Sequence, residues 1–250
     1  MIPIGASIIG FMLVFTRVST CLMILPGFSS VQVPINVRLF IALGVAVAVF
    51  SLAKIPFNYS VPIRPEQIFK LMAGEFLIAA ALAIPIRFFF LALSFLGEVI
   101  THLIGLNPIP GTPIADNQSS TVLSGLFNVT ATVLFFSTGL HFSFIMALAM
   151  SFELYPPGEV LSISLILSNT VENLGQFFNI VLRLGSPIVI YAVIANLIAG
   201  LVNKLTPQIP VYFVSAPFLI CGGIVLLTWM GDDLLMNFHL EVSNYMNRVL

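Results

Sequence analysis

The chain has 250 residues, of which 59% are hydrophobic and only 8% are charged. Because roughly 25% of the residues of a soluble domain carry charge, this composition excludes an ordinary soluble domain and indicates an integral membrane protein. Its formal net charge of −1, from nine Lys and Arg against ten Asp and Glu, provides neither a basic field that would attract nucleic acid nor an acidic field.

A helix that crosses a membrane needs about 20 mostly apolar residues. Breaks rich in Pro and Gly divide the chain into hairpins of such helices. Six segments meet the length requirement: Ile4–Leu25, Leu39–Phe57, Leu71–Leu96, Thr121–Met150, Ser186–Leu205 and Val211–Met230.

A seventh segment, Val160–Leu182, is apolar at its start and polar in its second half, where Glu172, Asn173, Gln176 and Asn179 occur. Lipid accepts such a face only at high cost, so it should meet protein or a water-filled cavity. The predicted fold class is therefore an all-α membrane protein of six to seven long apolar helices. A single membrane domain over residues 1–250 accounts for the whole chain.

Four charged residues interrupt or adjoin the apolar segments. Arg17 lies in the first segment, Glu75 and Arg87 lie in the third, and Glu98 follows just after it. Each would cost about 2.5 to 3.5 kcal/mol at a lipid-facing helix centre, so each is expected to face protein. The structural interpretation is ion pairing between packed helices or between subunits. The functional alternative is a proton or ion pathway.

One break differs from the others in composition. The stretch 105–119 holds three prolines and two glycines among several bulky apolar residues. Because proline fixes φ and removes a donor, this stretch cannot be helical throughout, yet it need not be floppy. It is either a plain connector or a structured loop that packs into a cavity or pore. The candidate residues for the second interpretation are Leu106, Asn107, Pro108, Ile109, Pro110, Gly111 and Ile114.

Catalytic and cofactor signatures are missing from the sequence. The three histidines, His102, His141 and His239, show no metal-ligand spacing. No phosphate-binding glycine motif and no nucleophile motif occurs, so neither an enzyme nor a cofactor is expected. A small-molecule or ion transporter remains open as an alternative, because charges within apolar helices are typical of transporters.

An ordered series of short motifs resembles the FliR/SctT family of type III export-gate proteins, in its flagellar branch. The resemblance extends from about residue 10 to residue 230. The motifs that carry it are Arg17, Pro26–Phe28, Val33-Pro34, Arg38–Leu43, Glu75, Leu134–Phe136 with Gly139 and His141, Ser151-Phe152, Pro156–Gly158, Asn196-Leu197, Gly200-Leu201 and Asn203–Ile209.

The resemblance implies a role that composition alone does not indicate. The chain would form, with FliP and FliQ, the entry pore of the bacterial inner membrane through which unfolded flagellar proteins are exported into the growing flagellum. It implies contacts with FlhB and FlhA, a place in the flagellar basal body, and packing in a hetero-oligomeric ring. It also implies that the loop at 105–119 plugs the closed pore, where Leu106, Ile109 and Ile114 would form a hydrophobic seal. An injectisome subunit of the same family is the closest alternative.

The end of the segment Ser186–Leu205 carries the last candidate contact. Lys204, Pro207 and Gln208 resemble a family motif in which an arginine is expected at position 204. Lysine keeps the charge there but loses the bidentate guanidinium. These residues are either an ordinary helix stop with a cation near the helix end, or a contact to a partner subunit.

Overall fold

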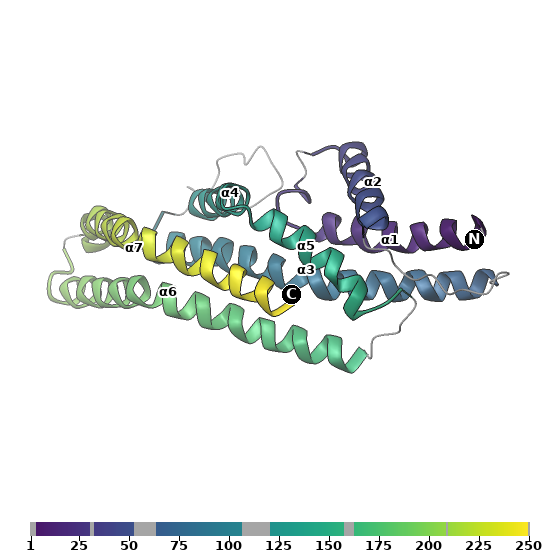
Figure 1. Cartoon of the computed structure of the whole chain (residues 1–250). Helices are drawn as coiled ribbons and strands as arrows, with labels where there is room; N and C mark the ends of the chain where they lie inside the picture. The colour runs from purple at the N-terminus through teal and green to yellow at the C-terminus, as the bar shows by residue number, and fades with distance from the viewer. Residues whose placement is uncertain are drawn as a thin grey trace. The chain divides into compact units, whose positions relative to one another are not determined.

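The structure, a computed structural model, describes residues 4–30, 33–52, 64–106, 121–157, 163–208 and 210–249. The secondary structure in these ranges is helical throughout, which confirms the predicted all-α class (Figure 1). Seven helices occur there: α1 (Ile4–Ile24), α2 (Ile35–Leu52), α3 (Pro65–Leu103), α4 (Val122–Ser137), α5 (Leu140–Leu154), α6 (Ile163–Leu205) and α7 (Val211–Val249).

Fewer helices are long enough to cross a membrane than the six segments predicted. Four helices, α1, α3, α6 and α7, have the length and apolar composition for a span. The pair α4 and α5 would make a fifth, but the two helices meet at an angle of 68°. The described part of the chain is therefore an α-helical membrane protein with four or five candidate spans.

The start of α3 lies six residues before the predicted one, because the chain carries start signals there. Pro65 occupies the first helical position, where its missing N–H costs no hydrogen bond. The side-chain Oε1 of Gln67 accepts a hydrogen bond from the backbone N–H of Arg64 at 3.2 Å, as in a capping box. Glu66 places a negative charge in the first turn, where the helix dipole favours it.

The predicted helix Thr121–Met150 is wrong as a single helix. Gly139 has φ of 76° and separates α4 from α5. A residue with a side chain rarely adopts this left-handed conformation, so glycine sets the break. His141 consequently lies in the first turn of α5.

The opposite correction applies to α6, which joins two segments predicted to be separate. Pro187 lies inside this helix and leaves the carbonyl of Arg183 without its backbone donor. The hydroxyl of Ser186 donates to that carbonyl at 3.1 Å. The lost hydrogen bond is therefore replaced locally, and the helix continues through the proline.

Helix α7 likewise extends well beyond the predicted end at Met230. The extension is amphipathic, with buried side chains every four residues at Leu234, Phe238, Val242 and Met246. That spacing keeps one face of a helix toward the protein, so packing sustains the helix after the apolar run ends.

The helices divide into two compact units, and α3, α4, α6 and α7 each contribute to both. The first unit comprises residues 1–88, 135–175 and 242–250. In it, α2 packs on α1 (Figure 1). Phe11 and Phe50 form an edge-to-face contact at 5.7 Å, and Ala42 and Ala46 of α2 are fully buried. A single domain over residues 1–250 stays a prediction.

The second unit comprises residues 89–134 and 176–241. Its helices pack closely at glycines: a Cβ built on Gly185 of α6 would lie 2.8 Å from Leu96 Cδ1 of α3. A Cβ on Gly222 of α7 would lie 2.6 Å from the Cζ atom of Tyr191, whose hydroxyl donates to the carbonyl of Phe218 at 2.9 Å. Small residues thus let α3, α6 and α7 approach one another in this unit.

Candidate functional site

Arg17 lies at the centre of a polar cluster in the first unit. Its side chain is fully buried in the middle of α1. Its Nε donates to Oε2 of Glu75 on α3 at 2.6 Å, and Glu75 is itself 1% exposed. The structure thereby answers a question that the sequence left open, because the partner of Arg17 within the chain is Glu75.

The same guanidinium also binds the C-terminal end of α5. One terminal nitrogen, Nη1, donates to the carbonyl of Ser151 at 2.9 Å and lies 3.1 Å from its Oγ. The other, Nη2, donates to the carbonyl of Tyr155 at 2.9 Å. The carbonyl of Ser151 also accepts the backbone N–H of Tyr155 at 2.9 Å. The carbonyls at the end of a helix carry partial negative charge, so a cation there is favourable.

An aromatic ring completes the surroundings of the cation. The Cζ atom of Arg17 lies 4.0 Å from the ring centroid of Phe152, which is a cation–π distance. Three helices, α1, α3 and α5, are therefore joined by one side chain. The pair joins packed helices, and its assignment to a structural role stays a prediction.

The other two charges noted in the sequence are not brought into this cluster. Arg87 and Glu98, both on α3, are exposed on the surface of the chain. Within the described ranges neither side chain forms an ion pair or a hydrogen bond. That these two side chains face protein stays a prediction.

The candidate loop lies almost entirely outside the described residues. Only Leu106 of its seven candidates is described, and it is 37% exposed. The other six, Asn107, Pro108, Ile109, Pro110, Gly111 and Ile114, fall in the range 107–120, which the structure does not describe. The attachment points of the loop, in contrast, are defined in detail.

The end of α3 before the loop is a Schellman motif. Gly105 has φ of 77°, the backbone N–H of Leu106 donates to the carbonyl of Thr101 at 3.0 Å, and that of Gly105 donates to His102 at 3.4 Å. These two bonds are the 6→1 and 5→2 bonds of the motif. The glycine therefore fixes the point at which the chain leaves the helix.

The start of α4 after the loop is fixed by Thr121. Its Oγ1 accepts a hydrogen bond from the backbone N–H of Ser124 at 3.3 Å, which is an N-cap interaction. The same oxygen lies 3.1 Å from Oγ1 of Thr101, and both threonines are buried. The two ends of the loop are therefore joined by a hydrogen bond between side chains.

Close backbone packing supports this junction. A Cβ built on Gly97 of α3 would lie 2.8 Å from the backbone nitrogen of Ser124 and 2.9 Å from the carbonyl carbon of Leu123. Any side chain at position 97 would push α4 away from α3. Sequence reasoning missed Gly97 and Thr101. Thr121 could have been found as an N-cap residue directly before an apolar run.

The third candidate group lies at the turn between α6 and α7. Lys204 is in the last turn of α6, and Pro207 and Gln208 follow in the turn, all exposed. The backbone N–H of Thr206 donates to the carbonyl of Val202 at 2.8 Å, which extends the helical hydrogen bonding past Lys204. A cation near these last carbonyls agrees with helix-end chemistry. A partner contact remains a prediction.

Comparison with known proteins supplies a family. The sequence profile of the bacterial export proteins, family 1, matches residues 8–244. Three relatives are each named flagellar biosynthetic protein FliR. They come from Caulobacter vibrioides, with 28% identity over 86% of this chain and 85% of its own length, from Aquifex aeolicus, with 27% over 88% and 84%, and from Escherichia coli K12, with 28% over 84% and 80%.

Proposed function

The chain belongs to the family of bacterial export proteins, family 1, and from this premise we propose that it is a subunit of the flagellar type III export gate. The observation that carries the proposal is the extent of the match, which covers residues 8–244. The relatives named above are all flagellar, and the similarity spans at least 80% of each of them. In this proposal the protein lies in the bacterial inner membrane, as part of the flagellar basal body.

In this proposal the chain assembles with FliP and FliQ into the pore that unfolded flagellar proteins enter. FlhB and FlhA are its further neighbours in the gate. Two properties support an assembly: the charged side chains Arg87 and Glu98 are exposed on a helix apolar enough to span a membrane, and large apolar side chains cover the outer faces of α6 and α7. Lipid disfavours the charged groups, whereas helices of other subunits would accommodate both kinds of group.

The loop between α3 and α4 is proposed as the plug of the closed pore. Thr101 and Thr121, which flank the loop in the sequence, are joined by a side-chain hydrogen bond, so the described residues on its two sides form a fixed base. A hydrophobic constriction can exclude ions by dewetting, and the loop supplies isoleucines and prolines for one. The energy for transport would come from other components of the apparatus.

The first experiment is purification of the tagged chain from its native membrane in a mild detergent, followed by mass spectrometry of the bound proteins. Recovery of FliP and FliQ supports the proposal. A chain recovered alone or as a homodimer contradicts it and favours the transporter alternative, which uptake by the single chain in vesicles would then test.

Two further measurements separate the remaining alternatives. Deletion of the gene should abolish swimming and leave effector secretion intact, whereas the reverse result indicates an injectisome subunit. Shortening the loop while keeping Thr101 and Thr121 should leave assembly intact and raise the ion conductance of the membrane. An assembled variant with the conductance of the unmodified gate would rule out the plug.

A further inference from the structure

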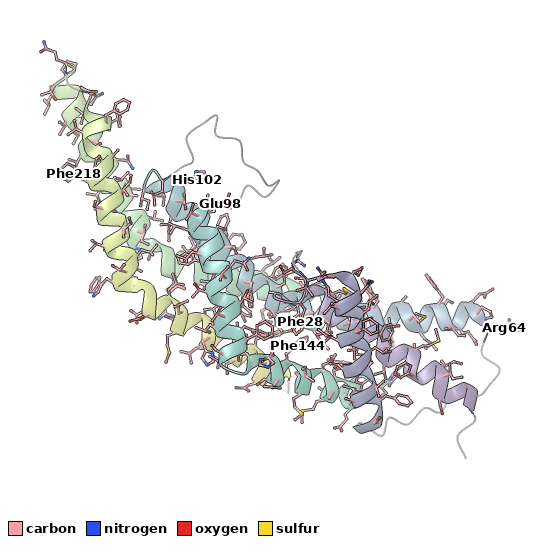
Figure 2. All side chains as sticks on the ribbon, turned by 90° about the horizontal axis from the view of Figure 1, so that it is seen from above. Phe28, Arg64, Glu98, His102, Phe144 and Phe218 are labelled. Atoms are coloured by element: carbon pink, nitrogen blue, oxygen red, sulfur yellow. The ribbon has the colours of Figure 1, made fainter. Side chains whose placement is uncertain are left out.

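Arg183 on α6 and Glu98 on α3 are charged, exposed and unpaired in the same compact unit. Both lie inside helices that are apolar and long enough to span a membrane. Among the described residues no ion pair or hydrogen bond involves the side chain of either residue. Glu98 also forms no ion pair with His102, which lies one turn further along α3 (Figure 2). An unpaired charge in such a helix is costly in contact with lipid. Each of the two side chains therefore needs a group of opposite charge beside it.

The packing of α3 on α6 places the two charges at a similar level. Leu96 of α3 reaches the backbone of Gly185 of α6, since its Cδ1 would lie 2.8 Å from a Cβ there. Glu98 and Arg183 are each two positions from this contact. With a rise of 1.5 Å per residue, they lie within about one turn of the same height.

The same spacing directs the two charges away from each other. Two residues correspond to roughly 200° around a helix, so each charge lies on the side of its helix opposite to the contact. Glu98 therefore occupies the outer face of α3, next to the exposed Phe95. Arg183 occupies the outer face of α6, with the exposed polar residues Asn179 and Ser186 one turn away on either side.

We propose that these two faces are docking surfaces for two different neighbouring helices of the export gate, an inference that rests on the proposed function. The neighbour against α6 presents a carboxylate to Arg183. The neighbour against α3 presents a cation to Glu98. The chain is thus held between two partners by ion pairs of opposite polarity, and charge complementarity at these faces fixes its place in the assembly.

The α6 face is tested in the complex purified with FliP and FliQ. The variant Arg183→Lys keeps the charge and introduces an amine, which a zero-length carbodiimide condenses with a nearby carboxylate to an amide, with the oxygen leaving in the urea. We expect a cross-link from position 183 to an acidic residue of another subunit. The unmodified chain is the control, because its guanidinium does not react.

Two results of this experiment overturn the inference. If the complex is intact and position 183 forms no cross-link, no carboxylate of a neighbouring subunit lies beside it. If position 183 is cross-linked to Glu98 or to another acid of this chain, the contact lies within the chain. If the unmodified chain does not recover FliP and FliQ at all, the proposed function fails as well. The two failures are therefore distinguishable.

A charge exchange tests whether the two neighbours are different. Arg183→Glu and Glu98→Lys should each lower the recovery of FliP or FliQ about tenfold or more, because a like charge replaces a matched one at an interface. The double variant should recover no more than the weaker single variant. Restoration of recovery in the double variant would show that the two residues pair with each other.

Arg64→Glu is the control, because Arg64 is an exposed cation before α3 (Figure 2). This variant should leave the recovery of FliP and FliQ unchanged.

Discussion

Two arginines in apolar helices have opposite surroundings in this protein. Arg17 is fully buried, and Glu75, two backbone carbonyls and an aromatic ring surround it within the chain. Arg183 is exposed, and no side-chain partner for it occurs among the described residues. The first arginine has its partners within the chain, whereas for the second we propose a partner on another chain. The role of a charged residue in an apolar helix therefore depends on the groups that surround it.

The largest expected effect follows from removing Arg17. Arg17→Met leaves the buried carboxylate of Glu75 without the guanidinium and the carbonyl of Tyr155 without its donor, whereas the carbonyl of Ser151 keeps the bond from the backbone N–H of Tyr155 at 2.9 Å. Loss of one member of a buried pair typically costs about 3 to 5 kcal/mol. The free energy of unfolding of the detergent-solubilised chain, from a dodecyl sulfate titration, should fall by that amount.

The matched variant Glu75→Gln removes the charge of the partner but keeps all bonds from Arg17 to α5. It should destabilise the chain less than Arg17→Met does. Equal losses for the two variants would mean that the carbonyl contacts contribute nothing and that the ion pair is the whole interaction.

Gly97→Val is expected to have the second largest effect. The new side chain would meet the backbone of α4 at less than 3 Å, where nothing can rotate away. Overpacking of this kind typically costs about 1 to 3 kcal/mol. The same unfolding titration measures it. Gly125→Val is the control, since a Cβ on Gly125 meets nothing within 4 Å. Both variants remove a helical glycine, so a similar stability for the two would contradict the close α3–α4 approach.

Thr121→Ala should have a smaller effect of about 0.5 to 2 kcal/mol, because it removes an N-cap and the contact with Thr101. Hydrogen exchange at the backbone amide of Ser124 should become faster in the same variant. Thr121→Ser retains the hydroxyl and should restore slow exchange. Fast exchange in the serine variant would show that the methyl group, and not the cap, holds the start of α4.

Arg183→Gln is expected to have the smallest effect on the free energy of unfolding of the isolated chain, in contrast to Arg17→Met. Exposed substitutions usually change stability by less than about 0.5 kcal/mol. The purified chain should therefore unfold as the unmodified one does. A loss comparable to that of Arg17→Met would mean that Arg183 has an internal partner.

Several elements could be predicted from local signals alone. The segment 4–25 was predicted within one residue of α1, because an uninterrupted apolar run ends at Pro26-Gly27. Pro65 and Gln67 are typical residues for the start of a helix and indicate where α3 begins. The predicted start was later because it was based on hydropathy alone. The family resemblance rested on ordered motifs, and the family match over residues 8–244 confirms it.

The helix boundaries that were predicted wrongly from the sequence depend on the backbone conformation or hydrogen bonding at single residues. Gly139 breaks an apolar stretch, whereas Pro187 does not break another, although proline is the stronger helix breaker. The difference is that Ser186 replaces the hydrogen bond lost at Pro187, and that Gly139 adopts a positive φ. Hydropathy averages over about 20 residues and does not register either event.

The sequence alone indicates that the chain is an apolar helical membrane protein and that Arg17 and Glu75 belong inside protein, since a charge near the centre of an apolar helix is costly in lipid. Only the tertiary structure decided which groups satisfy Arg17. Glu75 is 58 positions away in the sequence, and the carbonyls of Ser151 and Tyr155 are 134 and 138 positions away. A backbone carbonyl is present in every residue, so no pattern of side chains can indicate which one becomes a partner. The packing of α1, α3 and α5 against one another determines which carbonyls bind Arg17.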